Sequence, residues 1–116
     1  MRNANNKSFV PSSDIQSLLL RELKAYVLTN DPEAEVYLFG SRARQEAGDD
    51  SDWDFFVVTD QPNRRNSENQ LINGVYDLML KFDTLIQVLV YSKDVYNRGL
   101  SPNPLFDAVR KEGIKL

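Results

Sequence analysis

The spacing of hydrophobic residues in the first third of the chain predicts one long helix. Six residues between positions 15 and 27 recur at intervals of three and four, which is the repeat of an amphipathic helix. They are Ile15, Leu18, Leu19, Leu23, Tyr26 and Val27. Ser12 or Ser13 can cap this helix at its amino end, and Pro32 disfavours its continuation beyond Asn30.

A second long helix is predicted to begin at Ser67. Its apolar members include Leu71, Ile72, Val75, Leu78, Met79 and Phe82. The dipeptide Asn73-Gly74 within this stretch is also a hairpin signal, so the pattern leaves a turn open as an alternative. Shorter helices are indicated at 93–98 and 104–111, and one or two helical turns at 41–46.

Apolar runs rich in β-branched and aromatic residues predict strands at 36–39, 55–59 and 85–91, and a short terminal strand at 114–116. Strands separated by helices are typical of an α/β or α+β domain. We expect a small mixed sheet with helices on one face and the other face free for a ligand. Since 116 residues suffice for one core, a single domain is expected over 12–116, preceded by a flexible N-terminus over 1–11.

Composition narrows the possible chemistry. The chain has no cysteine and no histidine, which excludes disulfides, thiolate chemistry and a histidine base. Any metal must then be held by oxygen ligands, which favours Mg²⁺ or Mn²⁺. The net charge of -3 disfavours a nucleic-acid substrate, because binding through phosphates needs a basic surface. Without the apolar core of a signal peptide or an apolar run of membrane-spanning length, the protein is expected to be cytoplasmic, with no membrane partner.

The most specific pattern is a Gly-Ser turn followed by two aspartates. Asp52 and Asp54 stand two positions apart at the start of a predicted strand, so their carboxylates share one face with Cα atoms about 6.5 to 7 Å apart. Such a pair can clamp one divalent ion or bridge two. The residues of opposite parity, Trp53, Phe55 and Val57, are apolar and suited to packing beneath helices.

The Gly-Ser turn provides candidate phosphate ligands. Gly40 permits close approach of a ligand to the backbone, and the hydroxyl of Ser41 and the amides that follow can receive phosphate oxygens. Arg42 and Arg44 lie in the same turn, and one of them could reach a phosphate.

Three alternatives compete with this interpretation. A Gly-Ser turn alone is more often a plain chain reversal, and the aspartates could be a solvated turn before a strand. A calcium loop starting at Asp50 would need glycine at its sixth position and glutamate at its twelfth, where this chain has Phe55 and Gln61. The GxxxxGK[ST] loop and the GxGxxG fingerprint are both absent, which disfavours the two commonest nucleotide folds.

The residues resemble a known family. Leu38-Phe39-Gly40-Ser41-Arg42-Ala43-Arg44 followed by Ser51-Asp52-Trp53-Asp54 is similar to the signature of the DNA polymerase beta-like nucleotidyltransferases, specifically the minimal nucleotidyltransferases (MNT). The likeness continues through Val90-Tyr91-Ser92-Lys93 and 109–116. It implies a nucleoside triphosphate bound with Mg²⁺, held by Gly40 and Ser41 at the phosphates and by Asp52 and Asp54 at the metal. The implied reaction transfers a nucleoside monophosphate to an acceptor hydroxyl.

The chain departs from this family at the third carboxylate position, which is Gln87. An amide can offer an oxygen to Mg²⁺, but it brings no charge and cannot accept a proton as a base. Asp83 shares the parity of Gln87, yet four strand residues span about 13 Å, too far for simple substitution. Gln45, where the family often has glycine, is a lesser departure.

Two functions remain as hypotheses. One is a nucleotidyltransferase that transfers a nucleoside monophosphate, AMP being the candidate. The other is a catalytically weak, antitoxin-like nucleotide-binding protein. The resemblance suggests a partner, a helical HEPN-type toxin protein, because such pairs are common in this family.

Overall fold

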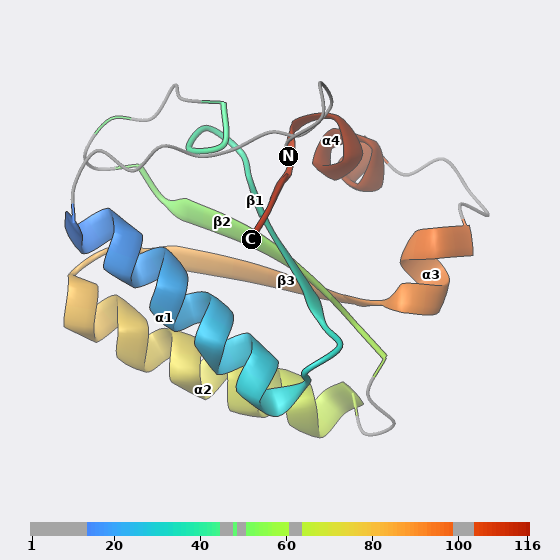
Figure 1. Ribbon diagram of the computed structural model, residues 1–116, viewed down its shortest axis with the longest axis horizontal. Coiled ribbons are helices and arrows are strands. Elements are labelled where there is room, and N and C mark those ends of the chain that lie inside the picture. Colours follow the sequence, from blue (N-terminus) through green and yellow to red (C-terminus); the bar gives the residue numbers. More distant parts are fainter. Residues whose placement is uncertain (1–13, 45–47, 49–50, 61–63, 99–103) are drawn as a thin grey trace, which may run out of the picture.

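The computed structural model describes residues 14–44, 48, 51–60, 64–98 and 104–116 (Figure 1). The predicted flexible N-terminus over 1–11 and the Ser12 or Ser13 cap lie outside this part of the chain. The elements run in the order α1 (Asp14–Asn30), β1 (Glu35–Phe39), β2 (Trp53–Thr59), α2 (Arg64–Phe82), β3 (Ile86–Ser92), α3 (Lys93–Arg98), α4 (Pro104–Glu112) and β4 (Ile114–Lys115). The predicted helices and strands agree with these bounds to within three residues at each end that is described.

The four strands form one mixed sheet in the order β3-β2-β1-β4. β1 pairs antiparallel with both β2 and β4, while β2 and β3 are parallel. Parallel neighbours need a crossover, and α2 provides it. The mixed α/β class predicted from the sequence is confirmed by this arrangement.

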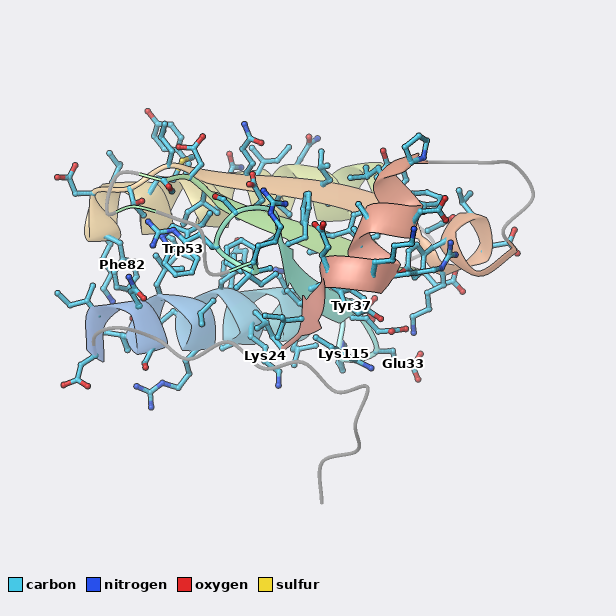
Figure 2. The ribbon with its side chains drawn as sticks, turned by 90° about the horizontal axis from the view of Figure 1, so that it is seen from above. Lys24, Glu33, Tyr37, Trp53, Phe82 and Lys115 are labelled. Carbon is cyan, nitrogen blue, oxygen red and sulfur yellow. The ribbon has the colours of Figure 1, made fainter. Side chains whose placement is uncertain are left out.

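The two long helices, α1 and α2, lie side by side on one face of the sheet (Figure 1). The predicted inward parity of β2 is correct, because Trp53, Phe55 and Val57 are buried in the core beneath these helices. Leu19, Leu23 and Val27 of α1 and Leu71, Val75 and Leu78 of α2 belong to the same core. Figure 2 shows Trp53 and Phe82 among the side chains of this layer.

Asn73-Gly74 is helical, not a turn, and the packing of α1 on α2 explains the glycine. A Cβ at Gly74 would lie 2.0 Å from Cζ of Tyr26, so only glycine leaves space for this ring. The Tyr26 hydroxyl also donates a hydrogen bond to the carbonyl oxygen of Gln70 at 2.8 Å. The glycine that suggested a hairpin in the sequence is therefore present because α1 packs closely against α2 at Gly74.

The opposite face of the sheet is not wholly free, which corrects the expectation that helices cover one face only. Phe56 and Val58 of β2 are buried there against Tyr96, Phe106 and Val109 of α3 and α4. The ring centroids of Phe56 and Phe106 are 5.7 Å apart in an edge-to-face arrangement. These apolar residues share the parity of Asp54, and α3 and α4 cover them at the far end of β2.

At the edge next to α4, β1 meets the short strand β4. Tyr37 stands opposite Lys115 in the register, as Figure 2 shows at the edge of the sheet. Tyr37 donates a hydrogen bond to Glu35 at 2.6 Å, and this bond lowers the pKa of the Glu35 carboxyl. In the described part of the chain, no helix is long and apolar enough to cross a membrane.

Candidate functional site

The turn after β1 brings Gly40 against the first carboxylate of β2. Phe39 pairs with Asp54 in the antiparallel register, so the chain turns at Gly40 directly beside that aspartate. Gly40 has a φ of 78°, a conformation that favours glycine. A Cβ at this position would lie 2.6 Å from Oδ2 of Asp54. Both the backbone conformation and the space therefore require glycine here.

Residues 41–44 form a turn closed by a hydrogen bond from the amide of Arg44 to the carbonyl oxygen of Gly40, at 3.1 Å. This agrees with the predicted helical turn, of which 45–46 lie outside the described residues. Ser41 is half-buried at the start of the turn, directly after Gly40. The turn therefore places a hydroxyl and backbone amides at the same end of the sheet as the aspartates.

Arg42 is buried, with 6% of its surface exposed. Its Nε and Nη2 both donate to the carbonyl oxygen of Ser51, at 3.2 and 2.7 Å, and its guanidinium lies 4.1 Å from the centroid of the Trp53 ring. These contacts join the turn after β1 to the residue that precedes Asp52. They favour a structural role for Arg42, which holds the two halves of the site together, over contact with a phosphate.

Arg44 is exposed at the rim of the site. Its Nη1 lies 3.1 Å from Oε2 of Glu112, which ties the turn to α4. The positive charge of Arg44 also acts on Asp54, whose pKa it lowers. Of the two arginines proposed as phosphate ligands, Arg44 is the one whose charge acts on Asp54.

Asp54 ionises less readily than an ordinary aspartate. Burial raises the pKa of its carboxyl, the negative charge of Asp52 raises it further, and Arg44 opposes both effects in part. A cation bound beside Asp54 would offset this repulsion by Asp52. The chain offers only oxygen donors here, and these suit Mg²⁺ or Mn²⁺.

The candidate metal site offers two carboxylates and not three. Among the described residues, no group of three or more acidic side chains gathers in a way that could hold an ion. Gln87 explains this directly, because it pairs with Asp54 in the parallel register of β2 and β3 and is exposed. Residues paired in this way point to the same face of the sheet about 4.8 Å apart. The amide of Gln87 therefore stands where a third carboxylate would complete the site.

Asp83 is not on the third strand. The separation of about 13 Å between Asp83 and Gln87, which assumed four residues of strand, is therefore not valid. It follows α2 with a φ of 51°, and β3 begins only at Ile86. Asp83 instead lines a cleft of about 410 Å³ together with Asp52. The other lining residues of this "Asp52 cleft" are Tyr76, Met79, Leu80, Thr84 and Leu85. Sequence reasoning missed the cleft, because no motif marks it.

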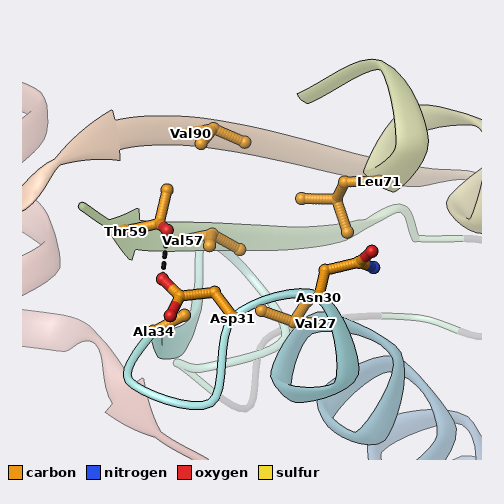
Figure 3. A pocket seen from close by; sticks show the side chains of 8 residues that line it. All are labelled: Val27, Asn30, Asp31, Ala34, Val57, Thr59, Leu71 and Val90. Atoms are coloured by element: carbon orange, nitrogen blue, oxygen red, sulfur yellow. Dashed lines mark hydrogen bonds between the residues drawn. The ribbon is translucent and has the colours of Figure 1, made fainter. Parts of the chain in front are cut away.

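A second cavity lies at the other end of β2 and has a structural function (Figure 3). It measures about 20 Å³, room for about one water molecule. Beside it, the buried Asp31 accepts hydrogen bonds from the hydroxyl of Thr59 and the amide of Glu33. Thr59 stands five residues from Asp54 along the strand, about 17 Å away. This pair fastens the end of α1 to the sheet, far from the candidate site.

Comparisons with known proteins identify the family of the chain. A family model described as "Nucleotidyltransferase domain" matches residues 20–110. The solved "Structure of putative minimal nucleotidyltransferase" is 26% identical, with a TM-score of 0.57, over 92% of this chain and 100% of that one. The crystal structure of "a putative nucleotidyltransferase from Sulfolobus solfataricus" is 21% identical over 93% of this chain and 90% of that one, with a TM-score of 0.45. A search of functionally curated proteins finds no match.

Proposed function

The chain belongs to the nucleotidyltransferase domain family, as a minimal nucleotidyltransferase of the polymerase beta-like superfamily, and we propose that it transfers AMP from ATP to an acceptor hydroxyl. The observation that supports this best is the contact between the Gly40 turn and Asp54. This contact places a candidate phosphate site directly beside a candidate metal site.

In this proposal one set of groups binds the phosphates and another binds the metal. The backbone of Gly40 and the hydroxyl of Ser41 bind the β- and γ-phosphates, and Arg44 adds positive charge at the rim. Asp52 and Asp54 hold Mg²⁺ or Mn²⁺ through their oxygens. When bound, the metal would neutralise charge on the reacting phosphate.

The reaction is an in-line displacement at the α-phosphorus. The acceptor oxygen forms a bond to the phosphorus, the bond to the bridging oxygen breaks, and pyrophosphate leaves toward the Gly40 turn. The hydroxyl proton must go to a base, and the amide of Gln87 beside Asp54 cannot take it. Water or a group on the acceptor would therefore receive this proton.

The same glutamine favours a second candidate function. With two carboxylates and no base at the strand position, the chain could bind ATP and turn it over weakly, and act as an antitoxin-like partner. In either case the proposed partner is a HEPN-type toxin protein, and the net charge of -3 argues against a nucleic-acid acceptor.

Mass spectrometry of the partner tests the proposal. The chain is purified with the protein encoded by its neighbouring gene, incubated with ATP and Mg²⁺, and the intact mass of the partner is measured. The gain of one AMP group supports the transferase. An unchanged partner mass, together with measurable ATP binding, supports the weak binding protein instead.

A further inference from the structure

The Asp52 cleft is unexplained by the phosphate and metal sites. Its volume of about 410 Å³ lies within the range of small-molecule sites, roughly 300 to 1,000 Å³. Asp52 lines one part of it, so the cleft is continuous with the candidate metal site. The remaining walls come from the second half of α2 and from the segment that leads into β3.

The strand order places this cleft opposite the phosphate turn. Gly40 follows β1, Asp52 and Asp54 stand at the start of the central strand β2, and Leu85 precedes β3. The amide of Trp53 donates to the carbonyl oxygen of Leu85 at 2.9 Å, which fixes the starts of β2 and β3 side by side. In an in-line displacement the attacking and leaving oxygens lie on opposite sides of the phosphorus. With pyrophosphate at the Gly40 turn, the acceptor approaches from the β3 side.

The lining of the cleft indicates the chemistry of its ligand. Tyr76, Leu80 and Leu85 remain 59%, 69% and 63% exposed, and together they offer an apolar and aromatic wall. The charged residues that line it are Asp52 and Asp83, both acidic. An anionic acceptor would be repelled by these carboxylates, whereas a cationic group would be attracted.

Asp83 occupies a backbone position that glycine usually fills. The amide of Thr84 donates to the carbonyl oxygen of Met79 at 3.3 Å, which closes the end of α2 around the left-handed residue. Aspartate and asparagine tolerate this conformation better than most residues with a side chain. Because asparagine is tolerated too, the charge of Asp83 can be removed without a change of backbone.

We propose that the Asp52 cleft is the acceptor subsite, and that it takes a hydroxyl compound with an apolar body and a positively charged group. The apolar body packs on Tyr76, Leu80 and Leu85, and the cation lies beside Asp83. The hydroxyl then faces the metal side of the cleft at Asp52. This inference rests on the proposed nucleotidyl transfer and specifies the class of acceptor.

The test compares two probes of equal shape and opposite charge. The ¹⁵N-labelled chain is titrated with tyramine and with 4-hydroxyphenylacetate, and amide shifts are followed at Thr84 and Leu85. We expect tyramine to shift these amides and the anionic probe to bind more weakly. Asp83→Asn should weaken tyramine binding by about 1.5- to five-fold, the range of one exposed ion pair. Asp77→Asn, which removes an exposed carboxylate of the same helix outside the cleft lining, should leave it unchanged.

Equal binding of the two probes, shifts confined to other residues, or unchanged tyramine affinity in Asp83→Asn would overturn the proposal. ATP with Mg²⁺ is titrated into the same sample as a separate readout. If the chain binds tyramine but does not bind ATP with Mg²⁺, the result counts against the proposed function alone. ATP binding without tyramine binding would count against the acceptor subsite alone.

Discussion

Gln87 on β3 stands beside Asp54 on β2, paired with it in the parallel register. The sequence identified Gln87 as the third carboxylate position only by its resemblance to a family. The sheet now gives the physical reason, because a carboxylate at this position would share one face with Asp54 about 4.8 Å away. The difference between this site and a three-carboxylate site is therefore one amide.

Restoring that carboxylate should raise the rate of transfer. We expect Gln87→Asp to increase AMP transfer to the purified partner by ~10²-fold, since a positioned base contributes at least that much. The measurement is the initial rate of partner modification with ATP and Mg²⁺. Gln87→Asn is the control, because it shortens the side chain equally and adds no charge. Equal rates for the two variants would show that the missing base does not limit the reaction.

Asp54 should be unfavourable for stability in the absence of metal. Its pKa is raised in the folded chain, so its contribution to stability is fully present below the ordinary aspartate range and is lost as the pH rises through the raised value. Near neutral pH, Asp54→Asn should stabilise the metal-free chain by about 0.5 to 1 kcal/mol, a small gain because solvent screens a partly exposed carboxyl.

Urea unfolding measured near pH 7 and near pH 3 checks this prediction. The gain from Asp54→Asn should shrink at the lower pH, where the wild-type carboxyl is also neutral. Mg²⁺ should stabilise the wild-type chain more than the variant, because binding of a ligand to the folded state adds stability. A variant less stable than wild type at neutral pH would contradict the raised pKa.

Gly40 should tolerate no side chain. In Gly40→Ala the new methyl group meets Oδ2 of Asp54, and the positive φ is strained for alanine. We expect a loss of about 1 to 3 kcal/mol in the free energy of unfolding and weaker Mg²⁺-dependent ATP binding. Gly48→Ala is the matched control, because a Cβ at Gly48 meets no atom of the described residues within 4 Å. Similar results for both variants would rule out a specific packing role for Gly40.

Arg42 should act through structure and not through its charge. Arg42→Lys keeps the charge that a phosphate would need, but a single ammonium cannot reproduce the paired donation to Ser51 or the planar contact with Trp53. We expect a loss of about 1 to 2 kcal/mol in unfolding free energy, measured by urea denaturation without nucleotide. Unchanged stability with weaker ATP binding would instead place Arg42 at a phosphate.

The sequence predicted the elements well, because their signals are local. Apolar spacing marked both long helices, and strand alternation correctly placed Trp53, Phe55 and Val57 toward them. Gly74 was ambiguous, since the same residue that suits a turn also makes room for Tyr26 across the helix pair. Such a contact between distant segments leaves no local pattern.

The site was predictable as a set of residues but not as an arrangement. Glycine, serine and aspartate at fixed spacing indicated phosphate and metal chemistry. The burial of Arg42 depends on Trp53 and Ser51 across the loop, and no spacing rule reveals it. The separation of Asp83 from Gln87 was measured as if the chain between them were extended, whereas the end of α2 holds Asp83 in a left-handed turn. Tertiary contacts decided the position of Arg42, and the hydrogen bond from Thr84 to Met79 at the end of α2 decided that of Asp83.

Mg²⁺-dependent binding of ATP tests the central claim most directly. ATP is titrated into the chain by isothermal titration calorimetry, with and without Mg²⁺. Three proteins are compared: the wild type, the double variant Asp52→Asn with Asp54→Asn, and the double variant Asp60→Asn with Asp77→Asn. The control pair removes two exposed carboxylates outside the site and so matches the change in net charge. Loss of Mg²⁺-dependent affinity in the first double variant and its retention in the second is the predicted result. Unchanged affinity in the Asp52 and Asp54 variant would contradict the account.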